Sequence, residues 1–287
     1  MGDDNIYIAV FPNKGKDKSN EILEKIVDYF KTRDVNIVLT KEDANFFGHP
    51  ELTVEDMSKI PIDVALSIGG DGTLLGVIRH FNYQPIPVCG INLGTLGFLA
   101  DIETSELEKR LEKIRQGDYR IEKRLILSGY VRTEKNPNDK IFLGNAINDV
   151  VVTKSGVARM LRIDLGIDDT RLVKCRADGI IVSTATGSTA YSLSAGGPIM
   201  NSNVRALLLT PICAHTFQFR PMVLNENDIV HIKVESGPTE ILVTFDGQKS
   251  AKVSVGDEII VEKSTNVVKI IRFEDKDFYS ILKNKLL

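Results

Sequence analysis

The sequence predicts an α/β fold combined with a β fold. We expect an N-terminal Rossmann-like α/β domain, a C-terminal β-sandwich-like domain, and a C-terminal segment that returns to the first domain. Up to about residue 119, strand-like apolar runs alternate with amphipathic helical patterns. Beyond it the apolar runs are short, β-branched and separated by turn residues, until residues 278–287 again show a helical pattern. The expected domains are residues 1–124 with 263–287, and residues 125–262.

The first domain is expected to be a parallel sheet with covering helices, because strands and helices alternate along it. Strands are predicted at residues 6–11, 35–39, 63–68 and 88–92. Helices are predicted at residues 19–31, 71–81 and 105–116. In the last of these, Ser105 and Glu108 have the spacing of a capping box, and Gly117 is expected to end the helix.

The second domain is expected to be mostly antiparallel β structure. Short strand-like runs lie at residues 125–127, 150–152, 180–182 and 229–232. Turn signals lie at residues 136–139, 236–238 and 246–247. Helical periods are scarce in this part of the chain, and residues 202–209 are one candidate helix.

Composition narrows the class of protein. A net charge of −3 over 287 residues gives no reason to expect a nucleic-acid partner. The three cysteines lie far apart and are odd in number, so we expect neither a disulfide framework nor a metal knuckle, and a cytoplasmic location fits. No signal peptide is expected at the acidic N-terminus, and no apolar run approaches the ~20 residues of a membrane span.

The run Gly69-Gly70-Asp71-Gly72-Thr73 joins a predicted buried strand to a predicted helix. Its glycines allow a sharp bend and close approach of a ligand, and the N-terminus of the helix suits phosphate. A carboxylate repels phosphate, so Asp71 makes sense there if it takes a proton from a hydroxyl or holds a metal ion between phosphates. The alternative is a tight turn in which Asp71 only caps the helix.

A second glycine-rich run, residues 90–99, follows the next predicted strand. Ligands bind beyond the carboxyl ends of strands in open α/β sheets, so the two runs are candidates for walls of one site. The alternative is a packing loop in which the glycines let Phe98 and Leu99 turn inward.

Two further segments are rich in polar groups. Asn148-Asp149 precedes an apolar strand, where an amide and an acid can bind a base edge and ribose hydroxyls, or simply form a turn. Residues 178–198 carry many small hydroxyl residues and glycines, which supply donors in little volume and suit a sugar-phosphate ligand. A buried hydrogen-bonded corner is the alternative for this segment.

Together these segments resemble the NAD kinase family. The resemblance covers residues 69–72, 92–99, 148–149, 178–198, 211–216, 220–221 and 246–248. Its spread in the right order over most of the chain makes it specific, whereas GGDGT alone also occurs in diacylglycerol and sphingosine kinases. Where the family more often has Asn-Glu this chain has Asn148-Asp149, so the acid is one methylene shorter.

The resemblance implies transfer of a phosphoryl group from ATP or another donor, such as polyphosphate, to the 2′-hydroxyl of the adenosine ribose of NAD, giving NADP. It also implies a divalent metal ion, usually magnesium, with no ligands that the sequence identifies, and a homodimer or homotetramer. Asp71 matches the catalytic acid, and Gly69, Gly70, Gly72 and Thr73 match the donor phosphate loop. The positions that match contacts to NAD are Asp71, Gly72, Asn148, Asp149, Arg159, Arg176, Asp178, Thr189, Ala190, Tyr191, Ser192, Leu193, Ser194 and Gln248.

Two other functions are weighed against this one. A lipid kinase would use the same GGDGT loop but needs an apolar substrate pocket, which the hydroxyl-rich residues 178–198 argue against. A sensor that binds NAD without catalysis gains little from an acid directed at phosphate, so Asp71 argues against it.

Overall fold

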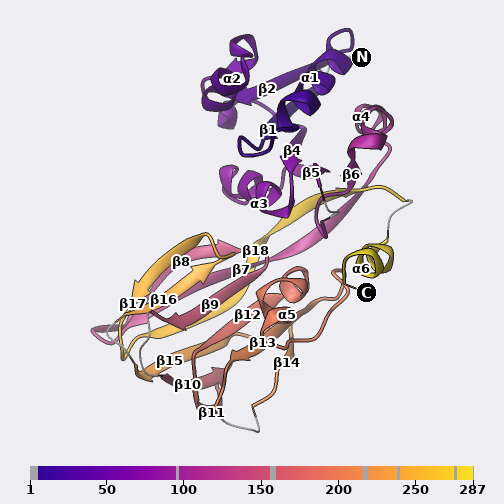
Figure 1. Cartoon of the computed structure of the whole chain (residues 1–287). Helices are drawn as coiled ribbons and strands as arrows, with labels where there is room; N and C mark the ends of the chain where they lie inside the picture. Colours follow the sequence, from indigo (N-terminus) through magenta and orange to yellow (C-terminus); the bar gives the residue numbers. More distant parts are fainter. Residues whose placement is uncertain are drawn as a thin grey trace. The chain divides into compact units, whose positions relative to one another are not determined.

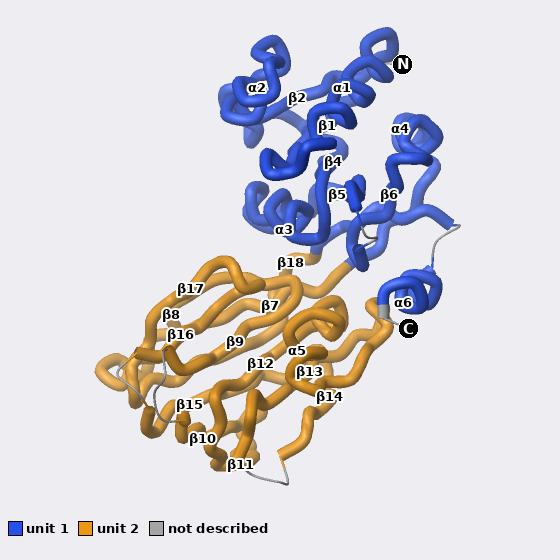
Figure 2. Tube along the Cα trace, viewed as in Figure 1, with its two compact units in different colours: residues 1–123, 268–287 blue, residues 124–267 orange. Residues whose placement is uncertain are grey.

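The computed structural model describes residues 6–94, 97–155, 160–215, 219–237, 240–274 and 277–286 (Figure 1). The chain divides into two compact units, residues 1–123 with 268–287 and residues 124–267 (Figure 2). Two long strands, β7 (Arg120–Thr133) and β18 (Glu258–Arg272), begin in one unit and end in the other. No helix among the described residues is long and apolar enough to cross a membrane.

Unit 1 is built on a parallel sheet, as the alternating pattern predicts. In the order β5-β4-β1-β2-β3, its strands are β5 (Pro87–Asn92), β4 (Val64–Gly69), β1 (Ile6–Pro12), β2 (Val35–Thr40) and β3 (Thr53–Val54). The short β6 (Ile102–Glu103) pairs with β5. Every residue of β4 is buried, which is typical of a strand covered on both faces.

The C-terminal segment returns to unit 1, as the sequence predicts. Lys269 and Ile270 at the end of β18 pair in parallel with Pro87 and Val88 of β5. The helix α6 (Phe278–Leu286) follows, also within unit 1.

The other helices of unit 1 are α1 (Ser19–Phe30), α2 (Lys41–Phe47), α3 (Asp71–His80) and α4 (Leu107–Gln116). The chain proceeds from β1 to β2 on one side and from β4 to β5 on the other. Since such crossovers are right-handed, α1 and α3 cover opposite faces, and the strand order reverses between β1 and β4. A reversal of this kind marks the position at which open α/β sheets bind ligands.

Unit 2 contains antiparallel β structure in two sheets. One sheet has the order β14-β13-β12-β9-β16-β17, and the other contains β11-β10-β15-β18 with β7 and β8. The strands not yet bounded are β8 (Asn136–Ala146), β9 (Asp149–Lys154), β10 (Leu161–Ile167), β11 (Thr170–Ala177), β12 (Gly179–Thr184), β13 (Ala206–Ile212), β14 (Met222–Asn225), β15 (Val230–Ser236), β16 (Ile241–Phe245) and β17 (Lys249–Val253). Val150 and Val152 of β9 and Leu161 and Ile163 of β10 belong to one buried core, so side chains of both sheets meet as in a sandwich.

Three local predictions are wrong. Residues 202–209 do not form a helix, because Ala206 begins β13, where Leu207 to Leu209 are fully buried. The turn predicted at residues 136–139 lies earlier, because Asn136 already pairs with Thr133 and begins β8. Ser105 does not cap α4. A 3-10 turn covers Thr104–Glu106, and the helix starts after Glu106 without a side-chain cap.

Candidate functional site

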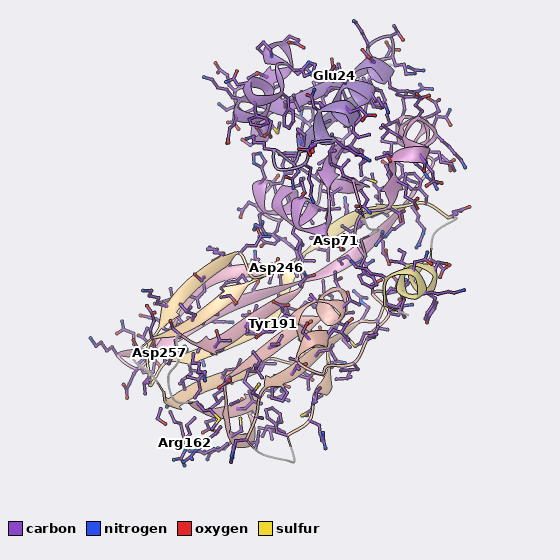
Figure 3. The ribbon with its side chains drawn as sticks, in the orientation of Figure 1. Glu24, Asp71, Arg162, Tyr191, Asp246 and Asp257 are labelled. Carbon is purple, nitrogen blue, oxygen red and sulfur yellow. The ribbon has the colours of Figure 1, made fainter. Side chains whose placement is uncertain are left out.

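The first group of site residues lies in unit 1 where the strand order reverses. Gly69 ends β4, and Asp71 begins α3 (Figure 3). From the end of β1, Asn13 reaches the same place, because its Nδ2 donates to Thr73 Oγ1 at 2.9 Å. The loop after β5 joins them, since the Leu93 N–H donates to the Gly69 carbonyl at 3.3 Å. Both glycine-rich runs therefore lie at one edge of the sheet.

The carboxylate of Asp71 is held by three consecutive backbone N–H groups. Oδ2 accepts from Phe98 at 2.9 Å, and Oδ1 accepts from Leu99 at 3.1 Å and Ala100 at 3.2 Å. A Cβ at Gly97 would overlap this carboxylate and would lie 2.7 Å from Asp71 Cγ. Asp71 therefore is not the cap of its helix, whose N-cap residue is Gly70; its carboxylate is instead directed by the second glycine-rich run.

The three glycines around Asp71 differ in whether their surroundings leave room for a side chain. A Cβ at Gly69 would lie 2.8 Å from Thr73 Cβ, so this position needs glycine for packing. At Gly70 and Gly72 a Cβ would meet nothing within 4 Å. The surface at these two positions is open, and it lies at the N-terminus of α3, a helix of 10 residues whose N–H groups favour anions.

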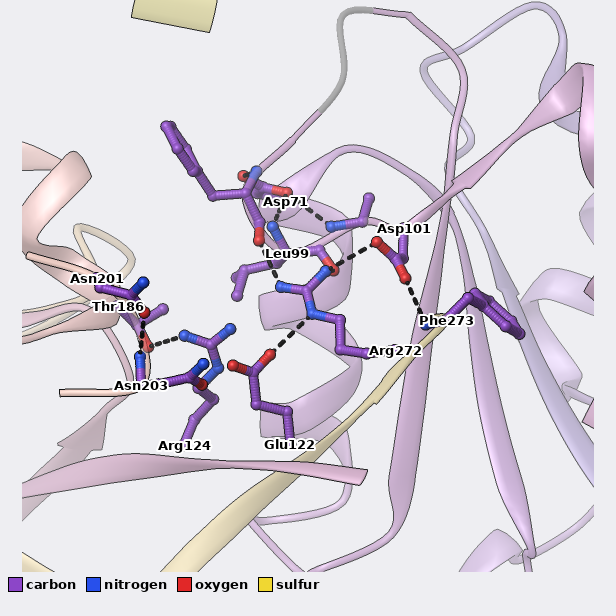
Figure 4. Close-up of polar contacts among 12 residues, drawn as sticks. Asp71, Leu99, Asp101, Glu122, Arg124, Thr186, Asn201, Asn203, Arg272 and Phe273 are labelled. Atoms are coloured by element: carbon purple, nitrogen blue, oxygen red, sulfur yellow. Dashed lines mark hydrogen bonds and ion pairs between the residues drawn. The ribbon is translucent and has the colours of Figure 1, made fainter. Parts of the chain in front are cut away.

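Two cations of the returning segment approach this loop. Arg272 is buried and donates to the carbonyls of Phe98 and Leu99 (Figure 4). Lys285 of α6 lies with its Nζ 3.9 Å from Asp71 Oδ2 and 4.7 Å from the centre of the Phe98 ring. The sequence contains no P-loop lysine motif. Lys285 nevertheless places a cation beside Asp71, and no sequence motif marks this lysine.

The second group of site residues lies at one end of the six-stranded sheet of unit 2. Asn148 and Asp149 precede and begin β9, which lies between β12 and β16. Both neighbours run antiparallel to β9, with Ser183 opposite Asp149 and Phe245 opposite Val150. The segments that leave β12 and β16 therefore start beside the Asn148-Asp149 turn, although they are far apart in the sequence.

The Asn148-Asp149 turn is held by Asp246, which follows β16. Asp246 Oδ1 accepts from the N–H groups of Ile147 at 3.0 Å, Asn148 at 2.7 Å and Asp149 at 3.3 Å. In return, the Asp246 N–H donates to the Asp149 carbonyl at 3.0 Å. Asp246 and Gly247 have φ of 51° and 64°, the turn that the Asp-Gly pair predicts, and this turn leaves Gln248 exposed beside the site.

The segment after β12 is tied to the same turn. Thr184 Oγ1 donates to the Ile147 carbonyl at 2.5 Å, and the Thr184 N–H donates to the Asn148 carbonyl at 2.9 Å. Gly187 then passes so close that a Cβ there would lie 2.6 Å from Asn148 Cα. The backbone contact between residues 148 and 187 explains why a glycine stands in this hydroxyl-rich run.

The carboxyl group of Asp149 is buried and lies near a second acid, Asp246. Only 4% of its surface is exposed, and burial, followed by the charge of Asp246, raises its pKa to about 7. Near neutral pH this carboxyl therefore exists in both protonation states, so it can either donate or accept a hydrogen bond.

The remaining hydroxyl-rich residues divide into two kinds. Ser192 is fully buried and shares a 2.8 Å hydrogen bond with Thr210, so its hydroxyl supports the loop from inside. Tyr191 is 45% exposed, and Ser194 is exposed as well (Figure 3). Thr189, Ala190 and Leu193 are partly buried.

Three predicted residues are not in this group. Asp178 precedes β12 and Thr184 ends it, so six residues of strand, roughly 20 Å, separate Asp178 from the Asn148-Asp149 end. The Asp178 carboxylate instead forms an ion pair with Lys154, with 2.6 Å between Asp178 Oδ1 and Lys154 Nζ. Arg176 lies on β11 of the other sheet, in a cationic pocket that it shares with Arg162, Lys174, Cys175 and His215. Arg159 is outside the described residues.

Sequence reasoning gave no role to Asn13, Arg272 and Lys285, and it included Thr184 and Asp246 only as parts of the segments 178–198 and 246–248 without roles of their own. An acid in an Asp-Gly turn directly after an apolar strand is a local signal that identifies Asp246. The contacts of Asn13 and Arg272 span 60 and more than 170 residues of chain, so no local pattern identifies them.

Comparison with known proteins agrees with this arrangement. The family model for the ATP-NAD kinase N-terminal domain matches residues 8–119, and that for the ATP-NAD kinase C-terminal domain matches residues 147–273. The chain belongs to the NAD kinase family. An NAD kinase of Moorella thermoacetica is 39% identical over 97% of this chain and 88% of its own length, and one of Carboxydothermus hydrogenoformans is 38% identical over 96% and 97%.

Solved structures show the same relationship. Yeast NADH kinase in complex with NADH matches 97% of this chain and 86% of its own with a TM-score of 0.88 at 26% identity. The Archaeoglobus fulgidus NAD kinase in complex with ATP matches 97% and 98% with a TM-score of 0.73 at 25% identity. The predicted family, fold class and NAD kinase activity are confirmed, and neither the lipid kinase nor the sensor is favoured.

Proposed function

We propose that this NAD kinase uses Asp71 as the base that removes the proton from the 2′-hydroxyl of the adenosine ribose of NAD. The ribose oxygen then attacks the γ-phosphorus of ATP, the bond from that phosphorus to the β–γ bridging oxygen breaks, and ADP and NADP result. A single observation supports this role most strongly. Three backbone N–H groups hold the Asp71 carboxylate at the edge of the sheet, beside glycines that leave the helix N-terminus open.

For the dinucleotide we propose contacts from Gly72, Asn148, Asp149, Tyr191 and the other matched residues of the 189–194 segment, with Gln248. The shared end of β9, β12 and β16 supports the members that lie in unit 2, except the buried Ser192, while Gly72 is proposed from its place beside Asp71. Arg176 and Asp178 are proposed as contacts on the family resemblance alone, as is Arg159.

Magnesium is proposed as the metal ion. Among the described residues, no three or more His, Cys, Asp or Glu side chains lie together as a metal cage. A magnesium ion that enters on the phosphates of the nucleotide needs only one or two protein carboxylates, so a cage of acids is not required. When bound, the ion would neutralise charge on the transferring phosphoryl group.

A homo-oligomer and a reducing, cytoplasmic setting complete the proposal. Cys89, Cys175 and Cys213 are free thiols, which fits a reducing compartment. ATP is the proposed main donor, and polyphosphate is the alternative to be compared with it in the assay.

The test is NADP formation from NAD by the purified chain, across donors and with or without magnesium, for the wild type and Asp71→Asn. Removing the base should lower kcat by ~10²–10⁴-fold while calorimetry still detects NAD binding. Asp43→Asn is the matched control, because Asp43 also lies in the first turn of a helix, in α2, and should leave turnover unchanged. Near-normal turnover of Asp71→Asn would refute the role assigned to Asp71.

A further inference from the structure

Arg272 and Asp71 contact the two ends of the same peptide groups. The peptide between Phe98 and Leu99 accepts from Arg272 Nη2 at its carbonyl, at 2.6 Å, and donates its N–H to Asp71 at 3.1 Å. The next peptide, between Leu99 and Ala100, accepts from Arg272 Nη1 at 3.2 Å and donates to Asp71 at 3.2 Å. Two consecutive peptides thus connect a guanidinium to a carboxylate (Figure 4).

From this geometry we infer that Arg272 is a positioning residue for Asp71 in the phosphoryl transfer, acting through the Phe98–Leu99 and Leu99–Ala100 peptides. The inference rests on the proposed role of Asp71 as the base. A cation at the carbonyl end polarises a peptide and strengthens its N–H as a donor, so the arginine both fixes the loop and strengthens the bonds that direct the carboxylate.

The site around Arg272 is built to keep the guanidinium in this place. Only 6% of the side chain is exposed, Nε donates to Glu122 at 3.0 Å, and Nη1 also donates to Asp101 at 3.2 Å. Asp101 in turn accepts from the Phe273 N–H at 3.0 Å. A planar guanidinium can serve two carbonyls and two carboxylates at once, whereas the single ammonium of a lysine cannot.

Through Arg272, the C-terminal segment that returns to unit 1 would also contribute to the reaction. Arg272 ends β18, far along the chain from Phe98 and Leu99, and no contact of Arg272 with a ligand is needed for the effect. If the two peptides shift by about 1 Å, the carboxylate they direct shifts with them, and a misplacement of that size can cost ~10²-fold in rate.

The test is a double-mutant cycle in the NADP-formation assay with Arg272→Lys and Asp71→Asn. Arg272→Lys should lower kcat by ~10–100-fold and change KM for NAD by less than about 3-fold. In the Asp71→Asn background the same substitution should change kcat by less than about 2-fold, because the group it positions is already disabled. A merely structural arginine would instead lower kcat by the same factor in both backgrounds.

The control is Arg110→Lys. Arg110 is a buried arginine of unit 1 that pairs with Glu106 and lies over the ring of Phe273, 4.5 Å from its centre, so its replacement tests whether loss of a neighbouring buried arginine alone lowers kcat. It should lower the melting temperature and leave kcat of the folded fraction within about 2-fold. If Arg272→Lys does not fold, Asp101→Asn replaces it in the cycle, because it releases one partner of Nη1 and keeps the arginine.

Each outcome of the cycle decides a different question. Near-normal turnover of Asp71→Asn overturns the proposed base and this inference with it. An inactive Asp71→Asn combined with equal effects of Arg272→Lys in both backgrounds overturns only the inference. Loss of the Arg272 effect in the Asp71→Asn background supports both.

Discussion

Asp149 should make the free energy of unfolding depend on pH, and a single substitution at this position should remove that contribution. Its pKa is raised from 3.8 to about 7 by burial and by the charge of Asp246. Between those two values the unfolded chain has an ionised Asp149, while the folded protein keeps the proton. Since the folded state binds more protons, the free energy of unfolding falls as the pH rises from about 4 to about 7, and this contribution is constant outside that window.

The size of the effect follows from the shift. About three pKa units at ~1.4 kcal/mol each correspond to about 4 kcal/mol, and little screening by water is expected at 4% exposure. Asp149→Asn mimics the protonated acid and cannot ionise. The variant should therefore be more stable than the wild type by about 1 kcal/mol at pH 4.5 and by about 4 kcal/mol at pH 8.

The assay is urea unfolding of both proteins at several pH values between 4.5 and 8.5, without nucleotide. Taking the difference between variant and wild type at each pH cancels the titration of the groups that do not interact with Asp149, which leaves Asp149 and its neighbour Asp246. The comparison variant is Asp228→Asn, which removes the acid that accepts from the Asn225 N–H in a turn away from the Asn148-Asp149 turn. A difference for Asp149→Asn that does not change with pH would refute the reasoning.

Two glycine substitutions test the close contacts of the two residue groups. Gly97→Ala would press a methyl group against the Asp71 carboxylate, so kcat for NADP formation should fall by ~10²-fold. The control is Gly94→Ala, whose Cβ would meet nothing within 4 Å and which should leave kcat unchanged. Equal kcat values for the two variants would contradict the geometry. Gly187→Ala would place a methyl group against the Asn148 backbone, so it should lower the melting temperature, measured by scanning calorimetry, and weaken NAD binding, measured by titration calorimetry. A variant with unchanged melting temperature and NAD affinity would contradict the importance of this close contact.

Those parts of the fold with strong local signals could be predicted from the sequence. The strand before Gly69 is a mostly apolar run that ends in glycines, and a shorter apolar run that contains Gly90 precedes Asn92. Where two local signals compete, the prediction fails. Residues 206–209 are apolar without a period, so helix and strand fit equally well, and only the pairing of β13 with β12 and β14 decides.

The turn near residue 136 failed for a related reason. Asn136-Pro137-Asn138-Asp139 has strong turn propensity, yet the chain turns at residues 134–135. Proline is tolerated in β8 because, in the part of the chain that the structure describes, this strand pairs with β7 alone. Local propensity identified that a hairpin exists here, whereas the register of β7 against β8 determines where it turns.

In the candidate site, sequence reasoning identified the acids but not what orients them. Asp71 and Asp149 are both aspartates beside apolar strands, yet their surroundings differ. Three N–H groups of one loop direct Asp71, whereas Asp149 is buried next to Asp246, whose own carboxylate accepts from the backbone of the turn. Neither environment can be read from neighbours in the sequence, because the donors lie about 27 residues from Asp71 and the partner acid about 97 residues from Asp149.

This difference has a consequence for which substitutions each acid tolerates. A carboxylate that receives N–H bonds at both oxygens cannot be lengthened or shortened without losing some of them, so Asp71 is fixed in length by residues 98–100. At position 149 it is Asp246 that accepts from the N–H groups of the turn, so those bonds do not set the length of the Asp149 side chain. The turn at position 149 therefore does not depend on the length of its acid, while a change of length at position 71 would break the bonds that direct the carboxylate.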